Sequence, residues 1–333
     1  MTGFIQTSKP AVVHVFPGQG DFALRILRRA VTTHPIVRGA VQEVFAEVDV
    51  AVAELGIGPL NPLTRMPAQR TARAPAPVGG DQAALFAACL STHVALNEAG
   101  YAPDRLAGVS FGEITALTAA GVFTVADGAR ICVKLARILP RDKGGLLWLS
   151  TGETEATRLL ATLGDPRLSL GCVNGPNQCV ISGSLTALAA CQHLAEQNGV
   201  KASMLRLRYY AHHPDLASAA SQFESTLRKF TMRPPRKAVF SAAHGRAYRR
   251  DEDIPHALAQ CLVQTAHVPR MITAACAGGP ALLFEAGTGT SATQGAAHLS
   301  SVKTRTPLAD ESFPWPTPSQ LHTTDSPDPG RQT

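Results

Sequence analysis

The order of apolar and polar residues along the chain predicts an α/β protein. Short apolar runs bounded by turn residues predict buried strands, and longer segments with apolar residues at helical spacing predict helices. The predicted strands are 11–16, 105–109, 237–241 and 281–285. The predicted helices are 81–98, 111–120 and 125–139, followed by Gly100, Gly121 and Pro140 as stop signals.

Residues 144–207 have a pattern of their own. Strand-like and helix-like segments follow one another there in the order β-α-β-β-α-β, which is typical of a ferredoxin-like unit. We therefore predict an α/β-hydrolase-like large subdomain, residues 1–143 and 208–303, with a ferredoxin-like small subdomain inserted at 144–207. Residues 304–333 are rich in Pro, Ser, Thr and Asp, which predicts a disordered tail.

Composition narrows the class of protein. The 333 residues are 45% hydrophobic and 17% charged, which allows a large core, and no apolar run is long enough to span a membrane. The N-terminus does not resemble a secretory signal, and none of the seven cysteines forms a C-x-x-C pair. We expect free thiols in a cytoplasmic enzyme, with no metal site and no membrane partner.

The net charge of +6 comes with three basic segments, 201–208, 228–237 and 246–250. The chain carries no nucleic-acid-binding motif and few aromatic residues among these charges, so we do not expect it to bind DNA or RNA. A basic surface could instead attract an acidic protein or a phosphorylated ligand, or simply keep the protein soluble.

Two motifs suggest acyl transfer chemistry. Gly108-Val109-Ser110-Phe111-Gly112 is a G-x-S-x-G elbow between a predicted strand and a predicted helix. Phe16-Pro17-Gly18-Gln19-Gly20 is a Gly-rich turn suited to presenting backbone N–H groups to an anion. A nucleophile beside an oxyanion site is the minimum for acyl transfer, although Ser110 could also be a plain helix N-cap.

A nucleophilic serine needs a base, and the chain has eleven histidines. Most lie in predicted strands and helices, where a structural role is expected. His212 and His213 differ, because they follow the last strand of the small subdomain and precede Pro214-Asp215. Clefts form at such junctions, so these two are the candidates for the base.

These motifs, in this order, resemble the malonyl-CoA:acyl-carrier-protein transacylase family, which includes the acyltransferase domains of polyketide synthases. The resemblance runs from about residue 12 to about 295. It rests on the two motifs above, on segments of the small subdomain and on Tyr-Ala-His-His at 210–213. It implies a Ser-His dyad that moves an acyl group from a thioester, through a serine ester, to the phosphopantetheine thiol of an acyl carrier protein.

The resemblance assigns roles by position. Ser110 is expected to be the nucleophile and His213 the base, with His212 in the variable place before it. Gln19 and Phe111 are expected to form the oxyanion hole. A backbone carbonyl from 285–290 would hold the other nitrogen of the base. Further pocket residues are expected to be Gln82, Val109, Leu135, Asn174 and Tyr210, together with His212. No bound cofactor is expected, because phosphopantetheine arrives on the partner or as part of CoA.

One departure from the family concerns the substrate. Family members that load malonyl units carry an Arg 25 positions after the serine, which grips the substrate carboxylate. That position is Leu135 in this chain. Arg137 is two residues further on, about 200° around a helix, and so is expected to face away. A helix irregularity that lets Arg137 or Arg130 substitute is the alternative.

Three further departures point the same way. Val109 replaces the family's His before the serine, Asp21-Phe22 replaces its Ser-Gln, and the selectivity segment 210–213 matches neither malonyl nor methylmalonyl enzymes. We therefore expect a chain acting in trans on a neutral-ended acyl group, such as a starter or aminoacyl unit, in polyketide-type antibiotic biosynthesis. The donor is either an acyl-CoA or an acyl carrier protein. Three alternatives stay open: a hydrolase that clears carrier proteins, a malonyl loader with a displaced Arg, and a docking module without catalysis.

Overall fold

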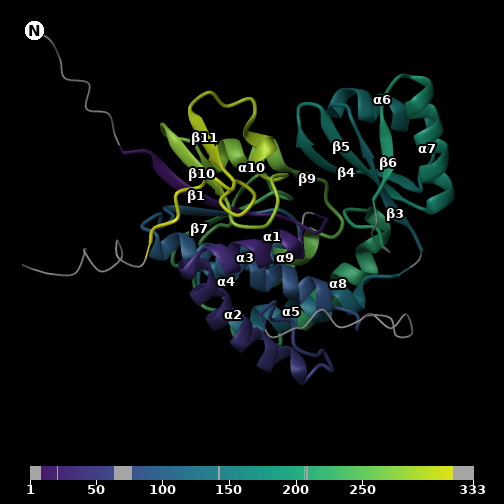
Figure 1. The fold of residues 1–333 in the computed structure, drawn as a ribbon. Helices are drawn as coiled ribbons and strands as arrows, with labels where there is room; N and C mark the ends of the chain where they lie inside the picture. The colour runs from purple at the N-terminus through teal and green to yellow at the C-terminus, as the bar shows by residue number, and fades with distance from the viewer. Residues whose placement is uncertain are drawn as a thin grey trace, which may run out of the picture.

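The architecture is described from a computed structural model, which covers residues 9–317 apart from 21, 64–76, 142, 206 and 208. It has a large α/β subdomain and a smaller one built on its own sheet, as Figure 1 shows. This is the predicted fold class, an α/β-hydrolase-like unit with a ferredoxin-like insertion. No helix of the covered residues is long and apolar enough to cross a membrane.

The large subdomain is centred on a six-stranded sheet in the order β11-β10-β1-β2-β7-β8. Neighbouring strands are parallel except for the β7–β8 pair, which is antiparallel. The strands are β1 (Ala11–Phe16), β2 (Arg105–Gly108), β7 (Ala238–Ser241), β8 (Arg246–Ala247), β10 (Ala281–Glu285) and β11 (Val302–Arg305). Because β1 and β2 are central and parallel, the turns that follow them lie together at the carboxyl edge of the sheet, where open α/β sheets bind ligands.

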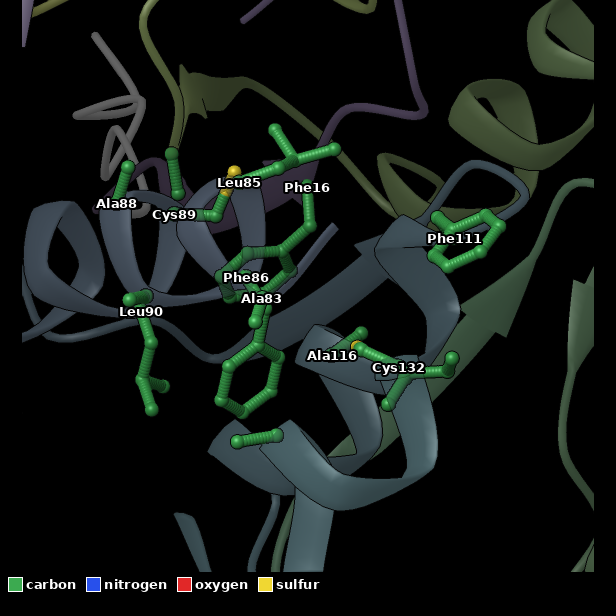
Figure 2. Close-up of a cluster of buried hydrophobic side chains, with 14 of the residues drawn as sticks. Phe16, Ala83, Leu85, Phe86, Ala88, Cys89, Leu90, Phe111, Ala116 and Cys132 are labelled. Carbon is green, nitrogen blue, oxygen red and sulfur yellow. The ribbon is translucent and has the colours of Figure 1, made fainter. Parts of the chain in front are cut away.

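Helices cover both faces of this sheet. Alternation along β1 points Val13 and Val15 to a cluster with Met271 and Ile272 of α10, while Phe16 points to the larger cluster under α3 (Figure 2). The helices are α1 (Leu24–Thr33), α2 (Pro35–Ala53), α3 (Gly80–Glu98), α4 (Gly112–Ala119), α5 (Val125–Ile138), α8 (Ala217–Leu227), α9 (Ile254–Gln260) and α10 (Val268–Ala275). Short 3₁₀ turns lie at Pro214–Leu216 and Thr293–Ala296.

The small subdomain follows the predicted β-α-β-β-α-β order. Its elements are β3 (Gly145–Leu149), α6 (Glu153–Leu163), β4 (Leu168–Gly175), β5 (Gln178–Gly183), α7 (Leu185–Gln197) and β6 (Ala202–Met204). The last strand ends at Met204, three residues before the predicted end of the small subdomain. β9 (Ala266–His267) arrives from the large subdomain and adds to this sheet beside β4, in the order β6-β3-β5-β4-β9. The two sheets are therefore joined by the segment that follows α9.

The predicted disordered tail differs from the structure over residues 304–317. β11 extends to Arg305, and Phe313 and Trp315 are buried beyond it. Their rings pack on each other at 4.9 Å, and Phe313 also contacts Tyr101 and Phe284. Two aromatic side chains bury enough apolar surface to hold a segment that is otherwise rich in Pro and polar residues. Residues 318–333 of the predicted tail lie outside the described part of the chain.

A buried histidine pair lies between β1 and α3. Nδ1 of His14 is 2.9 Å from Nδ1 of His93, and Nε2 of His14 is 2.9 Å from the carbonyl oxygen of Tyr101. The carbonyl can only accept, so Nε2 of His14 carries its proton and Nδ1 accepts from His93. Burial is the main cause that lowers both pKa values, that of His93 to about 4 and that of His14 well below its usual range.

This pair predicts that acid weakens the fold. Both histidines are neutral when folded, but unfolded histidine binds a proton below a pKa of about 6.5, so stability is full above that pH and falls as the pH drops toward 4. For His93 alone, we expect the free energy of unfolding in urea to fall by about 2 kcal/mol between pH 7.5 and pH 5. His93→Gln should lose this part of the dependence, and Ser91→Ala, on the same helix, should keep it. If the free energy of unfolding changes equally with pH in the wild type, His93→Gln and Ser91→Ala, the prediction is contradicted.

Candidate active site

The turn after β2 holds Ser110 in a strained conformation. Its φ is 55°, in the left-handed region that side chains rarely adopt. The flanking glycines are needed for close approach, since a Cβ on Gly108 would lie 2.5 Å from Cα of Glu113 and one on Gly112 would lie 2.1 Å from the carbonyl oxygen of Phe16. The strand-turn-helix arrangement is that of a nucleophile elbow, and it presents the Ser110 hydroxyl to a cavity.

His212 is the residue that meets Ser110. Its Nε2 lies 3.0 Å from Oγ of Ser110, and its Nδ1 lies 2.9 Å from the carbonyl oxygen of Gln264. Because that carbonyl can only accept, Nδ1 carries the proton and Nε2 is free to accept from the serine hydroxyl. Burial lowers the pKa of His212, and the hydrogen bond to Gln264 opposes this shift. A neutral imidazole in this tautomer is the form that a general base needs.

The predicted pairing of Ser110 with His213 is wrong. The His213 side chain is also buried, but its Nδ1 accepts a hydrogen bond from the backbone N–H of Asp215 at 3.2 Å. His213 is thus the N-cap of the 3₁₀ turn Pro214–Leu216. Pro214 holds His213 in extended backbone, whereas His212 adopts a positive φ of 57°. Adjacent residues with such different backbones send their rings to different places, and only His212 reaches the serine.

The predicted carbonyl partner of the base is also in a different place. We expected it in 285–290, but Gln264, in the segment between α9 and β9, holds Nδ1. Glu285 instead accepts hydrogen bonds from the backbone N–H and the hydroxyl of Thr293. Sequence spacing gave no signal for Gln264, because any backbone carbonyl can fill this role.

The two residues expected at the oxyanion hole lie beside the serine. Gln19 and Phe111 both line the cavity that holds Ser110. Phe111 is the N-cap of α4, so its backbone N–H is at the positive end of that helix. Within the described residues, neither backbone N–H donates a hydrogen bond to the protein. Two such donors near a serine can stabilise the negative oxygen of a tetrahedral intermediate.

The cavity beside Ser110 is small and mostly apolar. Its volume is about 120 Å³. Of the predicted pocket residues, Val109, Leu135, Asn174 and His212 line it. Its apolar walls also include Ile114, Leu139, Leu146, Val180, Leu205, Leu207, Phe223, Leu258 and Leu262. An apolar cavity of about 150 Å³ holds a molecule the size of benzene, so this one suits an acyl group of a few carbons.

Two predicted pocket residues lie elsewhere. Gln82 lines an adjoining hollow with Gln19 and Phe22, and its amide nitrogen is 3.4 Å from Oε1 of Gln19. Tyr210 does not line the cavity, and its ring packs edge-on against His213 at 5.2 Å. Asp21, which replaces a Ser of the family, lies outside the described residues.

Sequence reasoning missed Tyr209, which lines the cavity in place of Tyr210. The signal was present, because Leu205, Leu207 and Tyr209 alternate along the chain and all three face the cavity. A period of two places alternate side chains of an extended segment on one face.

No cationic side chain of the described residues lines the cavity. Leu135, at the position expected for Arg, is buried there with 3% of its surface exposed. Arg137 points away and donates hydrogen bonds to the carbonyls of Val78 and Leu55. Arg130 pairs with Glu54 and Asp127. Neither arginine occupies the position that a displaced carboxylate grip would require.

The chain matches known sequences over most of its length. The model of the acyl transferase domain family matches residues 71–287. The spectinabilin polyketide synthase system protein NorA' of Streptomyces orinoci is 33% identical over 240 residues, which cover 70% of this chain and 6% of that protein. Erythronolide synthase EryA3 of Saccharopolyspora erythraea is 30% identical over 247 residues, covering 73% and 7%. The chain thus spans only a small part of the curated relatives it matches.

Solved structures share the fold. The malonyl-CoA:acyl carrier protein transacylase FabD of Xanthomonas oryzae pv. oryzae superposes with a TM-score of 0.78 at 26% identity, covering 95% of this chain and 97% of that one. A malonyl-transacylase in complex with a type II polyketide synthase acyl-carrier protein gives a TM-score of 0.75 at 24% identity, covering 88% and 94%.

Proposed function

Because this chain belongs to the acyl transferase domain family, which matches more than half of its residues, we propose that it is an acyltransferase that loads an acyl carrier protein in polyketide-type biosynthesis. Its substrate is an acyl group without a free carboxylate. The observation that carries the proposal is the Ser110–His212 pair at 3.0 Å, which opens on an apolar cavity lined by Leu135.

The geometry supports a two-step transfer. Nε2 of His212 takes the proton of the Ser110 hydroxyl as its oxygen attacks the carbonyl carbon of a thioester. The backbone N–H groups of Gln19 and Phe111 hold the oxyanion that forms. The C–S bond then breaks, and the leaving thiolate takes the proton from His212. In the second step, a phosphopantetheine thiol gives its proton to His212 and attacks the Ser110 ester, and the serine oxygen leaves with that proton.

The cavity supports a neutral acyl tail. Among the described residues, no cation lines the cavity to pair with a malonyl carboxylate, and an unpaired buried charge costs several kcal/mol. A hydrocarbon tail buried against Leu135 and its apolar neighbours instead stabilises the complex by about 0.8 kcal/mol for each buried methylene. Starter units and other monocarboxylic acyl groups have this chemistry, and the aminoacyl units of related pathways have it when the amine is blocked.

The partners follow from the second step. Phosphopantetheine is brought by the carrier protein, or by CoA as donor, so the chain itself needs no bound cofactor. The hollow beside Gln82 and Phe22 adjoins the cavity, since Gln19 and Leu207 line both, and it offers a route for the pantetheine arm. The basic segment 228–237 includes Arg233, Arg236 and Lys237 and suits an acidic carrier surface.

Intact-protein mass spectrometry tests this proposal. The protein is incubated with acyl-CoA donors that differ only at the acyl end, such as butyryl-CoA and malonyl-CoA, and then with a phosphopantetheinylated carrier protein. We expect a butyryl adduct on the wild type, none on Ser110→Ala, and transfer of that adduct to the carrier. A malonyl adduct that forms faster than the butyryl one would overturn the substrate assignment. Release of the adduct mainly as free acid would make the protein a hydrolase.

A further inference from the structure

A fully buried carboxyl lies directly behind the nucleophile turn. Glu113 is 0% exposed, and its Oε1 accepts a hydrogen bond from Ser241 at 2.9 Å. Its Oε2 accepts from the hydroxyl of Tyr248 at 2.6 Å. The thiol of Cys261 lies beside this carboxylate, and it donates its own hydrogen bond to the carbonyl oxygen of Ala257 at 3.8 Å. Ser241, Tyr248 and Cys261 lie at the end of β7, in the segment after β8 and at the end of α9, so the Glu113 side chain contacts three separate parts of the chain.

Glu113 is also rigidly tied to Ser110. Its backbone N–H donates to the carbonyl oxygen of Ser110 at 2.9 Å, in the first turn that leads into α4. Gly108, on the other side of the serine, packs against the Glu113 backbone so closely that a Cβ there would lie 2.5 Å from Cα of Glu113. A shift of Glu113 would therefore carry the serine turn with it.

The other end of this network holds the histidine. Cys261 begins the segment whose Gln264 carbonyl accepts from Nδ1 of His212, and the Cys261 carbonyl also contacts the His212 ring. In the same segment, the Leu262 carbonyl accepts the backbone N–H of His213 at 3.0 Å. The segment 261–264 thus sets both the ring and the backbone of the base, and the Cys261 side chain links it to Glu113.

We propose that Glu113 is a positioning residue, whose carboxylate fixes the turn that carries Ser110 against the segment that orients His212. The inference rests on the Ser110–His212 pair of the proposed function. Glu113 itself does not line the cavity, so it acts on the serine and the histidine rather than on the acyl group.

The network works only with an ionised carboxylate, because a protonated one adds a donor where the hydroxyls of Ser241 and Tyr248 already donate. Burial raises the pKa of Glu113 to about 7, and the hydrogen bonds from Tyr248 and Ser241 oppose this shift. Of the groups that face it, Tyr248 and Cys261 have pKa values raised well above their usual ranges. Beyond Tyr248, burial lowers the pKa of His244, and Arg246 lowers that of Glu252 to about 2.

The reactivity of Ser110 should therefore fall as the pH drops through about 7. The ionised form of Glu113 is the competent one, so the loss occurs on the acid side of its pKa. The pKa of His212 is lowered from its usual value, so its own loss of base function comes at lower pH than Glu113's. Two separate acid limbs are expected.

The test is the rate at which a small fluorophosphonate labels Ser110, followed by mass spectrometry from pH 5.5 to 9. This probe needs the Ser–His pair but no particular acyl group. Tyr248→Phe removes the hydrogen bond that favours ionised Glu113, so we expect the upper acid limb of its pH profile to move up by about one pH unit. Labelling at pH 7 should then be about fivefold slower. Glu113→Gln should lose that limb and label slowly at every pH. The concentration of probe for half-maximal rate should change less than twofold in both.

Tyr101→Phe is the matched control. It also removes a tyrosine hydroxyl, but from a ring that contacts Phe284 and Phe313 instead of Glu113, and it should keep the wild-type profile. Ser241→Ala removes a second donor and should behave like Tyr248→Phe if the latter does not fold. A wild-type pH profile in folded Tyr248→Phe or Ser241→Ala overturns the positioning role alone. A wild type that the probe does not label overturns the proposed function as well.

Discussion

Replacing His212 by alanine is expected to slow the acylation of Ser110 roughly a thousandfold, whereas His213→Asn should slow it less than tenfold. Nε2 of His212 is the only described ring nitrogen that hydrogen-bonds to Oγ of Ser110. Without it, the serine must lose its proton to water, and general base catalysis typically contributes 10²–10⁴ in rate. His213 caps a 3₁₀ turn, and Asn can accept the same hydrogen bond from Asp215, so this change affects the fold more than the chemistry.

Single-turnover acylation by a neutral acyl-CoA, measured by rapid quench and mass spectrometry, checks this prediction. Ser110→Ala gives the background, and the unfolding temperature of each variant shows that it is folded. If His213→Asn slows acylation about a thousandfold and His212→Ala does not, the base is His213, as expected from the sequence. The 3.0 Å contact between His212 and Ser110 would then have no catalytic role.

The sequence was sufficient to predict the elements that carry the serine. An apolar run before a G-x-S-x-G turn and an apolar helix after it predict a strand-turn-helix unit. The turn must be tight, because only glycine fits at 108 and 112. The ferredoxin-like order was equally readable, since each strand and helix has its own period and stop signal. These features depend on residues close together in the sequence, where local rules apply.

The base was predicted as His213 instead of His212, because two adjacent histidines offer the same chemistry. A readable signal was nevertheless present in Pro214, which marks the first position of a helical turn and makes His213 its N-cap. Because the His213 side chain accepts the capping hydrogen bond, only His212 is available to accept one from Ser110. The Gln264 carbonyl and the Glu113 network could not be predicted, since both depend on contacts across 52 to 135 positions of sequence.

Leu135 stands where the family resemblance places the malonyl-binding Arg, and the helix geometry separates it from Arg137. Leu135 and Arg137 differ by two positions on α5, so one faces the cavity and the other the carbonyls of Val78 and Leu55. The depth of the cavity was not predictable. Phe223 and Leu258 close it from α8 and α9, two helices that the hydrophobic pattern does not predict.

Leu135→Arg is expected to reverse the acyl preference. A guanidinium at this buried position faces the cavity, where it can pair with a carboxylate but not with a hydrocarbon tail. We expect the rate of loading from butyryl-CoA to fall at least about 100-fold, because an unpaired buried charge costs several kcal/mol, and that from malonyl-CoA to rise at least about tenfold. The variant should also unfold more easily, and malonyl-CoA should restore part of that loss.

Two matched variants separate charge from shape. Leu135→Met keeps an apolar side chain of similar size and should keep the butyryl preference. Arg137→Leu removes the nearby cation and should leave the preference unchanged, because that guanidinium is bound to backbone carbonyls outside the cavity. Competition between butyryl-CoA and malonyl-CoA for Ser110, read as the ratio of the two adducts by mass, gives the preference in one experiment. A wild type that already favours malonyl, together with an Arg137→Leu variant that loses this preference, would show that Arg137 turns into the cavity and grips the carboxylate.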